Sequence, residues 1–131
     1  MIDRVPLERW YAYVADHDPP ALAAMVGDDC VFHSPVVHTP QRGKALTLGY
    51  LTAAFEVLGT DEFVYTREFT RERGAVLEFE TELDGIAING IDIIEWDAAG
   101  RIVDFKVMVR PLKAINLLHA LMAAQLARAK R

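Results

Sequence analysis

Hydrophobic side chains recur at helical spacing in the first half of the chain and again near its end. Spacings of three and four residues between apolar positions are typical of a helix with one buried face. We therefore predict a first helix, a second that starts at Pro19, a third that follows Gly43, and a final helix over residues 111–128. The positions that define the first of these apolar faces are Leu7, Trp10, Tyr11 and Val14.

The period changes from helical to alternating after the third helix. Apolar and polar residues alternate in four segments between residues 63 and 110, and turns that contain glycine separate these segments. One further short strand is predicted over residues 30–33, after a turn at residues 27–29. Because helices and hairpin-linked strands are segregated along the chain, we predict an α+β fold with an antiparallel sheet. A long curved meander backed by helices forms a half-open cone, whose concave side holds either core or a pocket.

Composition and charge narrow the classes of protein that remain. The chain has 131 residues, of which 52% are hydrophobic and 25% are charged, so we expect one folded domain over residues 1–131. The net charge of −5 argues against a nucleic-acid partner, because such partners require a basic surface. The excess of apolar residues in so short a chain predicts an unusually rich core, a lined cavity or an apolar interface.

The sequence shows neither a run of apolar residues long enough to cross a membrane nor the pattern of a signal peptide. Apolar runs end well short of the ~20 residues that cross a bilayer, and Asp3 and Glu8 interrupt the region where a signal peptide is apolar. The single cysteine, Cys30, cannot form an internal disulfide and fits a reducing compartment. The chain contains no phosphate-binding glycine loop and no compact set of metal ligands. We predict a cytoplasmic protein with no cofactor and no metal.

Asp92 is the most informative charged residue, because it stands among four isoleucines in an otherwise apolar strand. Alternation places Asp92 on the same face as Ile94 and Trp96. A carboxyl group that faces inward among apolar side chains has a raised pKa, and it can then donate a hydrogen bond or exchange a proton. The alternative is an outward aspartate paired with a surface lysine or arginine. We predict the inward orientation and a catalytic role for Asp92.

Aromatic and small polar residues around the expected pocket are the predicted ligand contacts. Trp10 offers an indole N–H as a donor, with a purely structural core tryptophan as the alternative. Alternation places Ser34 on the pocket side and turns His33 away from it. His38 lies in the loop near the mouth of the cone, where it is either a ligand contact or an ordinary loop histidine. The predicted ligand-binding residues are Trp10, Phe32, Ser34, His38, Tyr50, Phe79 and Phe105.

Two blocks of sequence resemble the NTF2-like superfamily, and within it the SnoaL-like and ketosteroid-isomerase-like branches. The first block is DDCVFHSPV at residues 28–36, followed by Gly43 and a helix, and the second is IDIIEW at residues 91–96, followed by GRIVD at residues 100–104. The resemblance covers residues 7–111. It implies a cystatin-like cone, in which a curved antiparallel sheet wraps around helices and encloses a concave pocket. This fold hosts isomerases, cyclases, dehydratases, epoxide hydrolases and non-enzymatic adaptors, so function has to be argued from the site.

The mechanistic template that the resemblance implies is ketosteroid isomerase, which uses a carboxylate base, a tyrosine and a protonated aspartic acid. By position, the base corresponds to Ser34, the tyrosine to Trp10 and the protonated acid to Asp92. A serine hydroxyl without a nearby base cannot take an α-proton at neutral pH, so we do not expect a ketosteroid isomerase of the usual mechanism. The Arg-x-Asp arrangement of the limonene-epoxide-hydrolase branch is also missing, because Gly90 stands where the arginine would be.

We therefore expect a SnoaL-like protein that binds a small apolar molecule carrying a carbonyl or hydroxyl group. The expected reaction is proton transfer, as in a steroid- or polyketide-type isomerase, cyclase or dehydratase. The alternative is a non-catalytic module that binds a ligand or a protein. A pocket of about 300 Å³ or more with Asp92 exposed to it favours the enzyme, whereas a cone filled by its own aromatic side chains favours the adaptor.

Two apolar surfaces remain after the pocket is assigned. The convex face of the sheet combines Ile93 and Met108 with Lys106 and Arg110. This mixture predicts a homodimer interface, and the alternative is an ordinary solvated sheet face. The last helix carries an apolar stripe that is expected to cap the cone, close the pocket or extend that interface. The residues of this stripe are Leu112, Ile115, Leu118, Met122 and Leu126.

Overall fold

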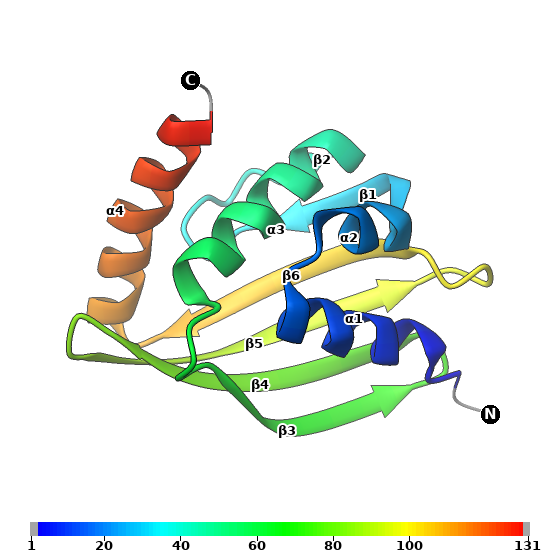
Figure 1. Cartoon of the computed structure of the whole chain (residues 1–131), viewed down its shortest axis with the longest axis horizontal. Helices are drawn as coiled ribbons and strands as arrows, with labels where there is room; N and C mark the ends of the chain where they lie inside the picture. Colours follow the sequence, from blue (N-terminus) through cyan, green and yellow to red (C-terminus); the bar gives the residue numbers. More distant parts are fainter. Residues whose placement is uncertain (1–2, 130–131) are drawn as a thin grey trace.

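The computed structural model describes residues 3–129 of the chain. These residues form a curved sheet with helices packed on one face (Figure 1). In chain order the elements are α1 (Val5–Asp16), α2 (Pro19–Met25), β1 (Val26–His33), β2 (Gln41–Arg42), α3 (Lys44–Leu58), β3 (Val64–Arg71), β4 (Gly74–Leu83), β5 (Ile86–Trp96), β6 (Ile102–Arg110) and α4 (Leu112–Ala129). The strand order in the sheet is β2-β1-β6-β5-β4-β3. Strands β1 and β6 run parallel, and the other neighbours run antiparallel. The predicted α+β cone is confirmed.

Local chemistry explains where the helices begin and end. Pro6 and Pro19 lie in the first turns of α1 and α2, where a missing backbone N–H breaks no helical hydrogen bond. His17 ends α1 in the left-handed conformation, and its backbone N–H donates to the carbonyl of Tyr13 at 2.6 Å. Gly43 precedes α3 with a φ of 101°, a conformation that favours glycine. The four predicted helices are therefore confirmed.

The predicted turn at residues 27–29 is wrong, because these residues belong to β1. The register between β1 and β6 shifts between Val26 and Val31, and this irregularity leaves Asp28 and Asp29 exposed without ending the strand. Two consecutive acidic residues indicate a turn when read locally, although here they occupy a bulged segment of strand. The strand β2 is only two residues long, too short to give a period.

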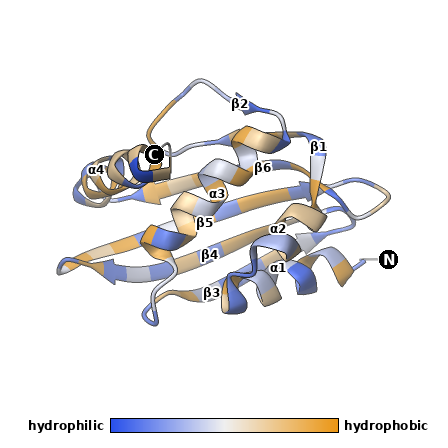
Figure 2. Ribbon diagram, turned by 45° about the horizontal axis from the view of Figure 1, so that its top comes forward, coloured by the Kyte–Doolittle hydropathy of each residue, from blue (hydrophilic) through white to orange (hydrophobic). Residues whose placement is uncertain are grey.

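The concave face of the sheet and the helices above it enclose the core. Hydrophobic and hydrophilic residues alternate along the strands (Figure 2), and the inward set is almost fully buried. Trp10 connects the layers, with its ring centroid 4.9 Å from that of Phe105 on β6 and 5.4 Å from that of Phe55 on α3. The largest fully buried aromatic side chains are Trp10, Phe32, Phe79 and Phe105.

The last helix packs through the predicted stripe except at its first residue. Leu112, the first residue of that stripe, is 71% exposed, whereas Ala114 and Leu118 are buried. The helix contacts α3, β5 and β6, and Leu118 and Met122 of the predicted stripe line the inner cavity. Within residues 3–129, no helix combines the length and hydrophobicity that crossing a bilayer demands.

Candidate functional site

Asp92 occupies the middle of β5, with its side chain on the concave face of the sheet. Its cross-strand neighbours are Leu77 on β4 and Val107 on β6, both apolar. Only 3% of Asp92 is exposed to solvent, and the burial pattern of β5 alternates as the sequence predicted. The inward orientation is therefore confirmed, while the catalytic role of Asp92 stays a prediction.

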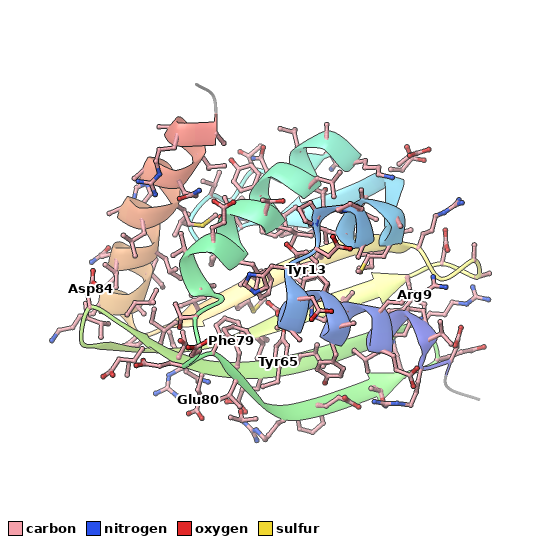
Figure 3. All side chains as sticks on the ribbon, in the orientation of Figure 1. Arg9, Tyr13, Tyr65, Phe79, Glu80 and Asp84 are labelled. Carbon is pink, nitrogen blue, oxygen red and sulfur yellow. The ribbon has the colours of Figure 1, made fainter. Side chains whose placement is uncertain are left out.

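A chain of hydrogen bonds leads from α1 through β3 to this carboxyl group. The indole Nε1–H of Trp10 donates to the hydroxyl oxygen of Tyr65 at 3.0 Å. The hydroxyl of Tyr65 in turn donates to Oδ2 of Asp92 at 2.5 Å, a separation typical of a charge-assisted bond. Figure 3 shows Tyr65 on the sheet near Phe79, below the helix that carries Tyr13. Within residues 3–129, Oδ1 of Asp92 has no protein hydrogen-bond partner.

Burial sets the protonation behaviour of this pair. Removal from water raises the pKa of Asp92 from 3.8 to about 7, and the hydrogen bond from Tyr65 limits that rise. Burial and the neighbouring carboxyl raise the pKa of Tyr65 well above its ordinary value, so its hydroxyl keeps its proton. Near neutral pH the site therefore contains a permanent donor, Tyr65, beside a carboxyl group that populates both its neutral and ionised forms.

Asp92 lines an internal cavity of about 30 Å³ on the concave side of the sheet. This volume accommodates one or two water molecules and is far below the 300 Å³ expected of a ligand pocket. Its walls come from α3, α4, the inner strands and residues 34–36, and its lining residues are apolar apart from Ser34 and Asp92. The site is thus a small apolar chamber with one carboxyl and one hydroxyl group in its walls.

The structure brings several of the predicted ligand contacts together at this cavity. Phe32, Ser34, Phe79 and Phe105 line it together with Asp92. Glycine at position 90 of β5 gives the Phe79 ring its place, because a Cβ there would overlap that ring. Their role as ligand contacts stays a prediction.

Other predicted residues lie elsewhere. Trp10 is buried outside the cavity lining, and its indole N–H donates to Tyr65. Tyr50 stacks on Phe32, with ring centroids 5.4 Å apart. His38 lines a separate surface groove of about 440 Å³, which shares Ser34 and two other lining residues with the inner cavity.

His33 points away from the cavity, as predicted, and contacts the carboxylate of Asp104 at 2.9 Å. Tyr65 is the site residue that sequence reasoning missed. Its only signal was its place among the alternating aromatics of β3, which gives no indication of a partner two strands away. In residues 3–129, no group of three or more histidine, cysteine or acidic side chains could hold a metal ion.

The geometry and the fold together define an NTF2-like, cystatin-like protein with a buried acid in its cone. Residues 7–105 match the model of the SnoaL-like domain family. The chain therefore belongs to the SnoaL-like family.

Solved structures support the same assignment. A steroid delta-isomerase from Pseudomonas aeruginosa is 34% identical, with a TM-score of 0.89 over 95% of this chain and 90% of that one. An uncharacterised protein with a cystatin-like fold from Silicibacter pomeroyi is 26% identical, with a TM-score of 0.85 over 93% and 85% of the two chains. An NTF2-like protein of unknown function from Mesorhizobium loti, at 20% identity and a TM-score of 0.71 over 85% and 97%, shares the fold. No functionally curated protein matches the sequence significantly.

Proposed function

We propose that this protein binds a small, largely apolar molecule with one carbonyl or hydroxyl oxygen directed at Asp92, and that Asp92 exchanges a proton or hydrogen bond with that oxygen. The observation that carries the proposal is the buried carboxyl of Asp92, which lines an apolar cavity while Tyr65 engages only its Oδ2 atom. A carboxyl group in otherwise largely apolar walls favours a ligand with a matching polar atom. The reaction class is isomerisation, cyclisation or dehydration by proton transfer.

Each protonation state of Asp92 suits a different ligand oxygen. The neutral acid donates to a carbonyl and stabilises the negative charge that develops there when a neighbouring C–H loses its proton. The ionised form accepts a proton from a hydroxyl group. Because the walls are largely apolar, either hydrogen bond is stronger than it would be in solution.

The second carboxylate of the isomerase template has no counterpart at position 34. The Ser34 hydroxyl accepts a hydrogen bond from the backbone N–H of Val36 at 3.2 Å, and an unactivated serine is a poor base for an α-proton. The similarity to the Pseudomonas steroid delta-isomerase supports apolar ketones of steroid type as the first ligands to test. It does not supply the base, so a reaction that starts from an already acidic or ionised carbon acid fits this site better.

A binding module without catalysis is the second candidate function. The observation that favours it is the cavity volume of about 30 Å³, which admits a steroid-sized ligand only if the walls move apart. Ser34, Pro35 and Val107 line both the cavity and the surface groove. A ligand that reaches the cavity from this groove would pass Ser34 and Pro35.

Binding and turnover of two steroids separate the candidates. Androst-4-ene-3,17-dione tests binding by calorimetry, and androst-5-ene-3,17-dione tests isomerisation through the absorbance of the conjugated product. The Asp92→Asn variant keeps a hydrogen-bond donor but cannot exchange a proton, so retained binding with lost turnover supports proton transfer by Asp92. Asp104→Asn, the same substitution at the side chain that contacts His33, is the matched control. Binding without turnover in the unmodified protein supports the module, and no binding of either steroid refutes the proposed ligand class.

A further inference from the structure

Two successive hydrogen bonds connect side chains from three elements: Trp10 of α1, Tyr65 of β3 and Asp92 of β5. They differ in what they can donate. An indole N–H only donates, a phenol has one proton and also accepts, and a neutral carboxyl has one proton that either oxygen can carry. The direction of both hydrogen bonds is therefore determined by Trp10, which can only donate.

The proton of Tyr65 has one productive direction. Because the hydroxyl oxygen of Tyr65 accepts from Trp10, its single proton is directed to Oδ2 of Asp92, which must accept it whether Asp92 is ionised or neutral. We infer that Trp10 and Tyr65 are positioning residues that keep the proton of neutral Asp92 on Oδ1, the oxygen without a protein partner, and so direct it to a ligand oxygen in the cavity. The ligand part of this inference rests on the proposed function, whereas the proton order does not.

This order makes the site selective for the kind of ligand oxygen. A ketone, which only accepts, requires the neutral form of Asp92 and is bound best below the pH at which Asp92 ionises. An alcohol, which can donate, is bound by the ionised form as well. The pKa of about 7 for Asp92 places this change of preference near neutral pH.

The groups around Asp92 leave Asp92 itself as the residue that determines how ligand preference depends on pH. Tyr65 contacts it directly and remains protonated. Tyr11 of α1 packs edge-on against Tyr65 with centroids 5.6 Å apart, and its hydroxyl donates to Glu68, which pairs with Arg4. The cross-strand neighbours of Asp92 on β4 and β6 are apolar, and the groups from α3 and α4 that line the cavity carry no charge.

The proton order is tested in the ligand-free protein by carboxyl NMR titration of Asp92. Tyr65→Phe removes the donor to Oδ2 and is expected to shift the Asp92 midpoint to higher pH. Trp10→Phe is expected to shift it in the same direction, because the Tyr65 hydroxyl can then accept a proton from Oδ2 of the neutral acid. In the Tyr65→Phe background, Trp10→Phe should have no further effect, since Trp10 acts only through Tyr65. Tyr11→Phe, a hydroxyl deletion at the neighbouring tyrosine, is the matched control and should leave the midpoint unchanged.

A second measurement keeps the inference falsifiable if Trp10→Phe does not fold. The indole N–H of Trp96 is buried and has no hydrogen-bond partner among residues 3–129, so the two tryptophans give an internal comparison. Tyr65→Phe should shift the indole resonance of Trp10 and leave that of Trp96 in place. An Asp92 midpoint that does not rise in Tyr65→Phe, or an effect of Trp10→Phe that persists without the Tyr65 hydroxyl, overturns the inferred proton order.

Ligand binding then separates this inference from the proposed function. Below the Asp92 midpoint, Trp10→Phe should weaken androst-4-ene-3,17-dione binding roughly five- to tenfold, because the proton moves from Oδ1 to the bond with Tyr65. If the titrations behave as expected but the unmodified protein binds no ketone, the proposed function fails and the proton order stands. If ketone binds and Trp10→Phe leaves its affinity unchanged, the positioning role is refuted while the binding site stands.

Discussion

The hydroxyl of Tyr65 reaches Oδ2 of Asp92 at 2.5 Å, although β3 and β5 are separated in the sheet by β4. Phe79 of β4 lies in register with both Tyr65 and Gly90. Because position 90 has no side chain, the Phe79 ring lies over the backbone of β5, beside Asp92. Gly90 and Phe79 thus help to define the surroundings of the hydrogen bond between Tyr65 and Asp92, whose strands are not neighbours in the sheet.

The buried acid makes stability depend on pH in an uncommon direction. The pKa of Asp92 is raised in the folded state, from 3.8 to about 7, so the folded protein binds the proton more tightly than the unfolded chain does. The contribution is fully present below the unfolded pKa and is lost as the pH rises through the folded one. A shift of this size corresponds to roughly 4 kcal/mol at most. We expect urea unfolding to show that Asp92→Asn gains stability relative to the unmodified protein between pH 5 and pH 8.

The control for this experiment is the same substitution at an exposed carboxyl group. Asp28 lies on β1 with its side chain in solvent, so Asp28→Asn should run parallel to the unmodified protein over the same pH range. A stability difference between Asp92→Asn and the unmodified protein that does not change with pH would show that Asp92 is ionised throughout.

Glycine at position 90 can be tested by adding one methyl group. A Cβ at this position would lie 2.6 Å from the backbone oxygen of Met108 and even closer to the ring of Phe79. We expect Gly90→Ala to destabilise the protein by about 1–3 kcal/mol, the usual cost of overpacking, and to alter the Asp92 titration. Thermal unfolding measures the first effect and carboxyl NMR the second. Gly49→Ala is the matched control, because a Cβ at Gly49 meets nothing within 4 Å; equal effects at both glycines would contradict the packing argument.

The periodicity of apolar residues along the sequence predicts most of the fold. It also predicts the inward orientation of Asp92, but not its hydrogen bond with Tyr65. Alternation in β5 was sufficient to turn Asp92 inward, because a strand with one buried face fixes the orientation of every residue in it. Tyr65 could not be found in the same way. The register between β3 and β4 shifts between Tyr65 and Arg67, so Tyr65 faces the core while Phe69, which shares its parity in the sequence, is 59% exposed. Neither the bulge nor a contact two strands away leaves a local signal.

A carboxylate at position 34 should restore the base that the isomerase template has and this chain lacks. Ser34 lines the same cavity as Asp92, so Ser34→Asp would place a base and an acid around one small apolar chamber. A positioned general base contributes about 10²–10⁴-fold to rate, and we expect a gain of at least tenfold in isomerisation of androst-5-ene-3,17-dione. Ser34→Asn controls for size and polarity. The same rate in both variants would show that position 34 does not reach the carbon that reacts.

Pairing of two copies through the convex face of the sheet is expected, and it can be tested at one exposed apolar residue. Met108 is 49% exposed on this face, where Ile93 and Phe69 also lie beside the ion pair of Arg71 and Glu95. A lysine at position 108 would bring like charges from two copies together in a two-fold contact. We expect Met108→Lys to lower the mass measured by sedimentation from that of a dimer to that of a monomer. Leu112→Lys is the matched control, since Leu112 is 71% exposed on α4. If only that variant dissociates the dimer, the interface lies on the last helix instead of the sheet.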